Sequence, residues 1–224
     1  MKFLISIFFI GLINLYYSQR IYIYLHGRGL LNSSFIFNNS IKTNENQSYA
    51  FALSGSGGLG ASFLYENKIG GSLEFLIGNH QAKYTGEDIT TGTPYSSKIN
   101  LSKVQIPLLF RLDREEGYIE IGPQLNMING ANYSSNFDGF DNDQVLDLYK
   151  RASISGVFGL GSYYTIGKRR SPLSLSFGFR INYGLTDIEG VNPSGTWVIE
   201  LPQKEKSILF TAGLNISFIY LSQK

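Results

Sequence analysis

Large apolar residues occupy every second position between Leu173 and Leu185, with small or polar residues between them. The apolar set is Leu173, Leu175, Phe177, Phe179, Ile181, Tyr183 and Leu185, and the polar set is Ser174, Ser176, Gly178, Arg180, Asn182 and Gly184. A period of two predicts a β-strand with one apolar and one polar face. The polar face is small and nearly uncharged, as the crowded interior of a narrow barrel requires. We therefore expect the apolar face to point outward, into lipid.

The same alternation, punctuated in places by glycine, recurs in eight segments of the chain. They are residues 20–31, 55–65, 69–78, 98–112, 118–130, 152–166, 173–185 and 207–221. The second, fourth and sixth connections between them are short, whereas the other four are polar and each approach twenty residues. This alternation places all tight turns at one end of a barrel together with both termini, as in a membrane barrel with periplasmic turns.

The fourth and fifth segments test which face points outward, because residues 114–115 can close a two-residue turn between them. In that register the apolar pairs are Phe110–Ile119, Leu108–Ile121 and Ile106–Pro123, and Gln105 lies opposite Gln124. The register also places Arg111 diagonal to Glu120. Because Pro107 and Pro123 each remove a donor from the ladder, we expect a bulge or a local break there.

Composition agrees with a barrel and excludes several other classes of protein. Of the 224 residues, 43% are hydrophobic and only 16% are charged, with 15 Tyr, 16 Phe and 25 Gly. These proportions favour strands and turns over helices. The chain has no Cys, which excludes a disulfide framework, a thiolate catalyst, a lipoprotein anchor cysteine and a cysteine metal site. A net charge of +2 gives no nucleic-acid footprint.

The N-terminus predicts export. Lys2 precedes an unbroken apolar run from Phe3 to Ile13, which Tyr17, Ser18 and Gln19 then close. We interpret residues 1–18 as a cleaved signal peptide and residues 19–224 as the mature domain, with a retained membrane anchor as the alternative. No later apolar run approaches the roughly 20 residues of a spanning helix. A mature chain that spans a membrane must therefore do so as a closed barrel.

The last segment carries a further sign of a membrane barrel. Residues 211–218, from Thr211 to Phe218, place a glycine two positions after a polar residue and then apolar residues at alternate positions. This pattern resembles the C-terminal signal that the outer-membrane barrel assembly machinery recognises, although the chain continues to Lys224. We therefore expect that machinery to be a partner during biogenesis and outer-membrane lipid to surround the mature protein.

At this point the chain resembles a known family. Residues 105–111 (QIPLLFR), followed after a tight turn by residues 118–123 (YIEIGP), resemble the outer-membrane β-barrel family of Bacteroidota that includes PorT. Gly159–Gly161, Arg180 and residues 183–188 (YGLTDI) resemble it as well. The resemblance covers essentially the whole mature chain. It implies an all-β fold: an eight-stranded antiparallel up-and-down transmembrane β-barrel of the OmpA/OmpX type, with short periplasmic turns and long extracellular loops. It supplies no agreed catalytic residues.

The charged side chains that point into the narrow lumen form the candidate site. By parity the inward charges are Glu74, Lys103, Arg111, Glu120 and Arg180. Unpaired charge is costly in such a lumen, so we expect these two acids and three bases to form a paired network. Since an eight-stranded barrel is only wide enough for its own side chains, we predict a plugged lumen. A structural network is favoured over its alternative, a gate or a proton-conducting switch.

Three other sequence motifs resemble functional sites, but each has a simpler structural interpretation. Residues 55–60 (GSGGLG) match a dinucleotide-binding fingerprint, but the residues that follow alternate as a strand and no helix is predicted. The acidic cluster Asp138, Asp141, Asn142 and Asp143 lacks the spacing of a calcium loop and is interpreted as solvated. His26 and His80 have no recognisable partner spacing for catalysis. We expect no metal and no cofactor.

Aromatic residues are expected to form belts where the barrel meets the membrane interfaces. Those near the predicted strand ends or in the long loops are Tyr22, Tyr24, Tyr65, Tyr84, Tyr118, Tyr133 and Trp197. Amphipathic rings of this kind gather at the headgroup level in membrane barrels.

The sequence thus predicts an integral outer-membrane barrel without enzymatic activity. Its role is structural, accessory or binding, exerted through the long extracellular loops and the barrel surface. One alternative is an accessory component of type IX protein secretion, in which PorT is implicated, with a secretion-system or envelope protein as partner. A second is a lipid hydrolase at the barrel rim that uses His26 or His80. A soluble lipocalin-like carrier is disfavoured, because its exterior would consist of Ser, Gly and Asn.

Overall fold

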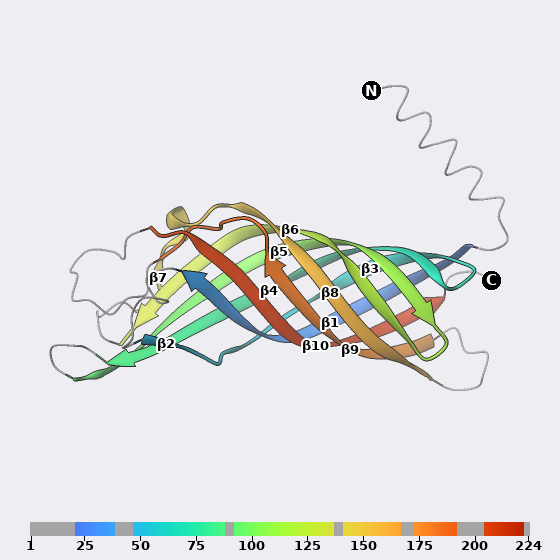
Figure 1. Cartoon of the computed structure of the whole chain (residues 1–224), viewed down its shortest axis with the longest axis horizontal. Coiled ribbons are helices and arrows are strands. Elements are labelled where there is room, and N and C mark those ends of the chain that lie inside the picture. The colour runs from blue at the N-terminus through green and yellow to red at the C-terminus, as the bar shows by residue number, and fades with distance from the viewer. Residues whose placement is uncertain are drawn as a thin grey trace, which may run out of the picture.

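The computed structural model describes residues 21–38, 47–87, 92–136, 141–166, 173–191 and 204–221. Eight long antiparallel strands form a closed ring in chain order (Figure 1). They are β1 (Ile21–Asn38), β3 (Leu53–Tyr65), β4 (Ile69–Glu87), β5 (Pro94–Arg114), β6 (Gly117–Ser135), β8 (Ala152–Thr165), β9 (Leu173–Gly184) and β10 (Ser207–Leu221). Pairing of β10 with β1 closes the ring. The predicted up-and-down barrel is confirmed.

Three short elements lie at one end of this ring. β2 (Gln47–Ala50) pairs with β4, β7 (Asp143–Gln144) pairs with β6, and a 3₁₀ turn, η1, spans Leu146–Leu148. We call this end the loop end. The opposite end, where β1 begins and β10 ends, carries the turns β3–β4 and β5–β6 and is called the turn end. Among the described residues, no helix combines the length and the apolarity needed to cross a membrane.

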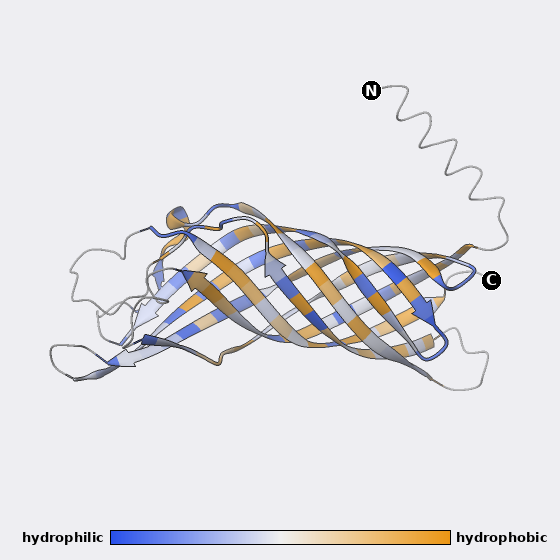
Figure 2. Cartoon of the chain, in the orientation of Figure 1, coloured by the Kyte–Doolittle hydropathy of each residue, from blue (hydrophilic) through white to orange (hydrophobic). Residues whose placement is uncertain are grey.

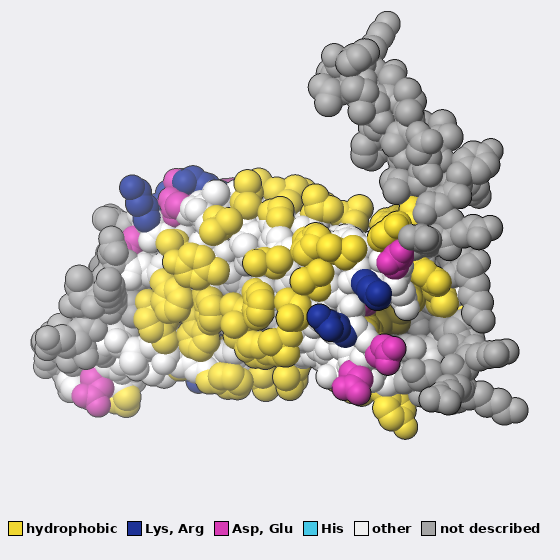
Figure 3. Space-filling view, turned by 45° about the vertical axis from the view of Figure 1, so that its right-hand side comes forward, with side chains coloured by type: hydrophobic (Ala, Val, Ile, Leu, Met, Phe, Trp, Pro, Cys, Tyr) yellow, Lys and Arg dark blue, Asp and Glu magenta, His cyan; other side chains and the backbone are white. Residues whose placement is uncertain are grey.

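The apolar side chains face outward, as the alternation in the sequence predicts. Phe177 and Phe179 are 52% and 37% exposed, whereas Arg180 and Asn182, which follow them on the same strand, are 1% and 6% exposed. Hydrophobic and hydrophilic positions alternate along the strands that face the viewer (Figure 2), and apolar side chains cover the middle of the visible wall, with charged groups toward its two ends (Figure 3). The surface is therefore inverted relative to a water-soluble barrel, with an apolar band outside and a polar bore.

The stagger of the ring fixes the width of the bore. A path through paired residues that leaves β1 at Ile23 crosses the other seven strands and returns to β1 at Ser33, ten residues farther along. Strand number and stagger together set the tilt and the diameter of a barrel. Eight strands with this stagger leave an interior that side chains alone can fill.

The predicted turn between β5 and β6 is displaced by one residue, which shifts the pairing register of the two strands by two residues. Glu115 and Glu116 form its loop, Arg114 pairs with Gly117, and Arg111 lies directly opposite Glu120 instead of diagonal to it. A shift of two residues leaves every side chain on its predicted face, because the strand period is two. Apolar alternation therefore fixed the faces but not the register.

A local break lies where Pro107 was expected to disturb the ladder. Pairing of β5 with β6 is interrupted between Pro107 and Phe110 and resumes in the same register. The register itself changes only between Ser102 and Lys103, where a bulge inserts one extra residue into β6. Beyond this bulge the odd-numbered residues Ala131, Tyr133 and Ser135 point inward, whereas the even-numbered ones do so below it.

The predicted aromatic belts are in part wrong. Tyr84, Tyr118 and Tyr133 are buried inside the barrel, because strand parity turns them toward the bore, and Trp197 lies outside the described residues. Other aromatic residues occupy the outer wall near the two ends. Tyr65, Tyr164 and Tyr220 are exposed toward the turn end, and Phe35, Phe37 and Phe210 cluster toward the loop end with ring centroids 6.1 to 6.3 Å apart. The Tyr49 ring contacts Phe35 and Phe37 at 6.3 and 5.2 Å and also the inward Tyr84 ring at 5.7 Å.

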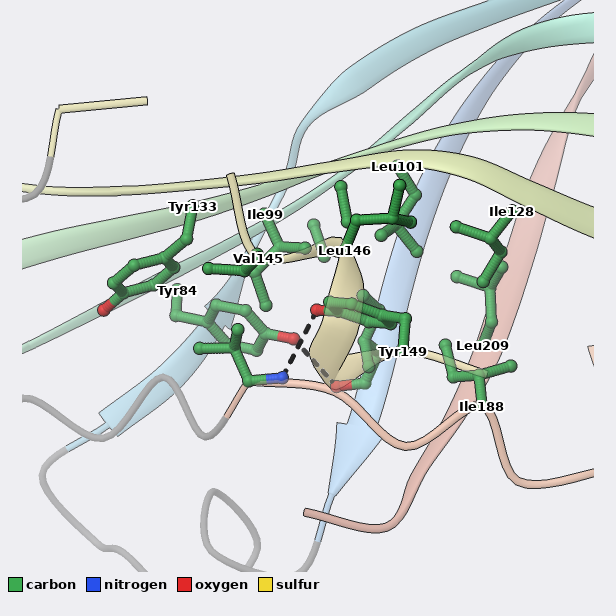
Figure 4. Close-up of a cluster of buried hydrophobic side chains, with 14 residues drawn as sticks. Tyr84, Ile99, Leu101, Ile128, Tyr133, Val145, Leu146, Tyr149, Ile188 and Leu209 are labelled. Atoms are coloured by element: carbon green, nitrogen blue, oxygen red, sulfur yellow. Dashed lines mark hydrogen bonds between the residues drawn. The ribbon is translucent and has the colours of Figure 1, made fainter. Parts of the chain in front are cut away.

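An apolar cluster fills the bore at the loop end (Figure 4), and we call it the apolar cap. Its members are Ile36, Ala82, Tyr84, Ile99, Leu101, Ile128, Ala131, Tyr133, Val145, Leu146, Tyr149, Ile188, Val191 and Leu209. The strands supply most of it, and the β6–β8 and β9–β10 connections fold inward to supply the rest. The Tyr84 hydroxyl donates to the Ile36 carbonyl at 2.9 Å, and the Val191 amide donates to the Tyr149 hydroxyl at 3.4 Å.

The inverted surface predicts a position-dependent cost of charge. Leu73 is central among the apolar residues on the outer face of β4 and is 51% exposed. We expect Leu73→Arg to lower the free energy of unfolding by about 2–4 kcal/mol, because it puts a cation near the bilayer midplane. Urea unfolding of the protein in phospholipid vesicles, followed by the heat-modifiable gel band, measures this change. Lys83→Arg, on the same strand beyond the apolar band, is the matched control, and equal losses in both variants would contradict the assignment.

Candidate functional site

Four charged side chains meet across the middle of the bore, and we call them the ion network. Arg28 comes from β1, Glu74 from β4, Glu120 from β6 and Arg180 from β9. Each glutamate contacts both arginines. Arg180 donates to Glu74 at 2.8 Å and, through Nε, to Glu120 at 3.0 Å, and Arg28 lies 2.7 Å from Glu120 and 3.2 Å from Glu74. The four side chains are at most 1% exposed, so each charge depends on the others in place of water.

A second charged layer lies below the ion network, toward the turn end. The Nε of Arg111 donates to Asp113 at 2.7 Å, and the Tyr163 hydroxyl accepts from Arg111 and donates to Asp113. The Arg111 guanidinium also lies 4.1 Å from the centroid of the Tyr118 ring, a cation–π contact. Its Nη1 is 3.9 Å from Glu120, which joins this layer to the ion network.

Two glycines make room for the ion network. A Cβ on Gly60 of β3 would lie 2.5 Å from the His26 ring and 2.8 Å from Glu74, and one on Gly159 of β8 would lie 2.7 Å from Glu120. Real Cβ atoms do not approach that closely. The inward positions next to these charged side chains therefore have no room for a side chain. This explains why glycine occupies them on both strands.

The structure brings together four of the five predicted lumen residues. Glu74, Arg111, Glu120 and Arg180 are joined in the two charged layers. Lys103 is the exception: it points into the bore, is 2% exposed, and among the described residues has no ion-pair or hydrogen-bond partner. Its Cα lies opposite Gly78 on β4 and Ile128 on β6, close to the apolar cap and away from the carboxylates.

The sequence analysis did not identify Arg28 and Asp113 as members of the two charged layers. With them, the layers hold three acids and three arginines. Arg28 lies between Gly27 and Gly29, which give no local apolar signal for the facing of the strand. The apolar odd positions of β1, from Ile21 to Leu31, did carry that signal. Asp113 was assigned to the turn, and the two-residue shift of register extends β5 past it.

Both histidines lie inside the bore rather than at its rim. His26 Nε2 is 3.4 Å from Glu74. His80 is 1% exposed and lies 3.2 Å from Ser34 through Nδ1 and 3.2 Å from the Gln105 amide oxygen through Nε2. A buried Ser–His–Gln chain has no carboxylate to orient the imidazole and stabilise its protonated form. It forms part of a polar layer between the ion network and the apolar cap.

A cavity of about 1090 Å³ occupies the turn end of the bore. Tyr24, His26, Arg111, Asp113 and Tyr163 line its inner part, and side chains of the β3–β4 and β5–β6 turns form its rim. The bore is thus hollow toward the turn end. From the ion network to the apolar cap it is filled by side chains.

The remaining sequence motifs have no ligand site in the described residues. Residues 55–60, the apparent dinucleotide fingerprint, lie within strand β3, as expected. The backbone of Gly58 passes so close to β4 that a Cβ there would meet the Phe75 carbonyl oxygen. Asp138 of the acidic cluster lies outside the described residues. Within the part of the chain that is described, no three His, Cys, Asp or Glu side chains converge as metal ligands do.

Comparison with known proteins agrees with this geometry. A family model described as "Outer membrane protein beta-barrel domain" matches residues 18–190. The chain belongs to this family. Membership places the protein in the outer membrane, with its apolar band in the hydrocarbon. The predicted signal peptide, residues 1–18, lies outside the described residues. Among curated proteins no relative matches.

Solved structures similar to this member of the family are outer-membrane barrels. They include OprG from Pseudomonas aeruginosa, with 14% identity, a TM-score of 0.43, and coverage of 90% of this chain and 96% of that one. Neisserial surface protein A shares 12% identity at a TM-score of 0.39 over 87% and 95% of the two chains. The outer membrane protein AlkL shares 13% identity at a TM-score of 0.39 over 92% of each.

The ion network predicts a large cost for removing one acid. We expect Glu120→Gln to lower the free energy of unfolding by about 3–5 kcal/mol, because it leaves Arg28 and Arg180 with one carboxylate between them. Urea unfolding in phospholipid vesicles measures the change.

Lys103→Met is the matched control, since it removes a buried charge that has no described partner. Its stability should stay within about 1 kcal/mol of the original protein or exceed it. A Glu120→Gln protein as stable as the Lys103→Met protein would show that the network contributes nothing.

Proposed function

We propose that this protein is a non-enzymatic outer-membrane barrel with a closed bore, acting through its extracellular loops and its outer surface. The observation that carries the proposal is the double closure of the bore. Two layers of paired charges cross its middle, and the apolar cap covers its loop end. A solute would have to break several buried ion pairs and then pass an apolar plug, and both steps are costly.

The placement of the histidines supports the absence of catalysis. A hydrolase at the rim needs a nucleophile and a base that a lipid substrate can reach. Ser34 and His80 are 0% and 1% exposed and lie beneath the apolar cap, and His26 contacts Glu74 inside the bore. These groups make polar contacts within the bore, so neither of the two histidines that the hydrolase alternative would use lies at the rim.

The loop end is organised as a binding surface would be. Lys150 of the β6–β8 connection lies 3.1 Å from Asp187 and 3.2 Å from Glu189, and Lys204 also pairs with Glu189. The Asp187 carboxylate accepts the amides of Glu189 and Ser207, each at 2.8 Å. These contacts tie two long connections to each other and to the start of β10, so part of the surface at the loop end has a fixed shape.

A narrower form of the proposal follows from the resemblance to the PorT-containing family. In that form the loop end docks a protein component of type IX secretion. The hairpin with Pro107 and Pro123 supports it, since that hairpin carries the most specific part of the resemblance. Stable co-purification of one protein partner from native membranes is the expected sign, and recovery with lipid alone would contradict it.

The closed bore predicts an electrically silent protein. Purified protein in a planar lipid bilayer should give no steady current above that of the bare membrane, because paired charges and the apolar cap exclude a continuous water path. Single-channel recording measures this directly. Steady large-pore currents from pure protein would contradict the proposed function.

The loop contacts predict a titration at low pH. Burial raises the pKa of Asp187, but the amides of Ser207 and Glu189 and the Lys150 ammonium outweigh it, so the pKa lies below its ordinary value. The stabilisation from Asp187 is therefore present above about pH 4 and is lost as the pH falls through the lower folded pKa. Amide chemical shifts of Ser207 and Glu189 should titrate with a midpoint below about 3.9. Asp187→Asn should abolish this titration of the two amide shifts. A midpoint above the ordinary pKa of an aspartate would contradict the lowered pKa of Asp187.

A further inference from the structure

Two lysines lie directly opposite each other on the outer wall of the barrel. Lys83 of β4 pairs with Lys98 of β5, and both point outward because Ala82, Tyr84 and Ile99 beside them point into the apolar cap. Directly opposed residues have Cβ atoms about 5 Å apart, and like charges in such a pair are destabilising. The sheet therefore carries a repulsive pair that it does not need for its own stability.

Among the described residues, no acid occupies an outward strand position directly beside either lysine. The neighbouring outward positions are Gln81, Thr85, Ser96, Asn100 and Ser134, with Ala50 of β2 opposite Lys83. Among the described ion pairs, none includes either lysine. The nearest acid along β4 is Glu87, four residues or about 13 Å farther along the strand. Strand β6 separates Lys98 from Asp143 of β7.

The aromatic cluster at the loop end fixes the height of this pair in the membrane. Lys83 is paired with Ala50, and the residue before it, Tyr49, contacts the rings of Phe35 and Phe37 at 6.3 and 5.2 Å. Aromatic belts of membrane barrels lie at the headgroup level. On β4 the outward residues change from apolar to polar after Ile77. The lysines therefore stand beside the headgroups of the outer leaflet, past the edge of the hydrocarbon.

We propose that Lys83 and Lys98 bind the anionic headgroup of a phosphorylated glycolipid of the outer leaflet. Two lysines whose Cβ atoms lie about 5 Å apart can place both ammonium groups on one phosphate or bridge two phosphates. The outward amide of Gln81, two residues before Lys83 on β4, offers a donor and an acceptor to sugar hydroxyls. A membrane lipid is favoured over free phosphate, because the bilayer already holds its headgroup at this height and concentrates it there. This inference goes beyond the proposed function by naming a ligand class for the outer surface.

The test uses the full mature protein, folded in a zwitterionic detergent and titrated with lipid A, a diphosphorylated glucosamine lipid. Binding is measured by native mass spectrometry. A lysine near an anionic surface contributes about fivefold in affinity, so Lys83→Ser and Lys98→Ser should each weaken binding about fivefold and the double variant about 25-fold. The matched control is Lys68→Ser with Arg114→Ser, which removes an equal positive charge at the turn end and should leave binding unchanged.

Three results would overturn the inference. In the first, the double variant binds lipid A as tightly as the original protein does. In the second, the original protein binds dephosphorylated lipid A as tightly as lipid A. In the third, inorganic phosphate displaces lipid A at the concentrations at which lipid A binds. Without lipid A, the double variant should unfold on a heat-modifiable gel at the same temperature as the original protein or a higher one, because it lacks the repulsive pair. This control separates lost binding from lost folding. An electrically silent barrel that binds no lipid A would overturn this inference alone.

Discussion

The structure depends on one constraint, which is that hydrocarbon offers no hydrogen bonds to a backbone. Each unpaired N–H or C=O group in the bilayer costs several kcal/mol, so a sheet that crosses it must close on itself. Here β10 closes on β1 over fifteen residue pairs, from Tyr24–Leu221 to Asn38–Ser207. Closure with eight strands then dictates the rest: the apolar rows must face lipid, and the other rows must fill a bore only as wide as their own side chains.

A bore of this width explains both its charges and its glycines. Buried charge is costly unless each ion has opposite partners at hydrogen-bond distance. Arg28, Glu74, Glu120 and Arg180 meet this condition by reaching across from four different strands. Such contacts need space beside the reaching side chains, and Gly60 and Gly159 provide it. The ion network therefore couples distant strands through the bore, in addition to the hydrogen bonds that couple neighbouring strands along the wall.

The comparison of sequence with structure separates what periodicity determines from what it leaves open. A period of two determines the face of each side chain, which is why Phe177 and Arg180 lie where the alternation predicts. It does not determine register, so the pairing of β5 with β6 differs from the predicted one by two residues. Nor does periodicity identify side chains of a loop that fold into the bore. Val145, Leu146 and Tyr149 lie in a segment that reads as a wet loop, yet the open end of a bore gives them an apolar surface to cover.

The polar network was predictable in kind but not in membership. Parity and the cost of unpaired charge predict that inward acids and bases will pair, and they name Glu74, Glu120 and Arg180. They cannot say at which height along the bore each residue lies, because height depends on the stagger of the ring. Lys103 shares its inward face with the network, but its register places it beside Ile128, near the apolar cap.

Closure of the bore moves the capacity for specific recognition to the ends and the outer wall. Within the apolar band the wall meets only lipid chains, which select by shape and not by charge. Beyond the band, β4 and β5 continue as paired strands from Asn79 to Glu87 and from Pro94 to Ser102, so their polar side chains stand on a rigid sheet rather than on loops. Polar groups fixed on a sheet lose little conformational freedom when they bind, which makes this extension better suited to a specific contact than a loop of the same composition.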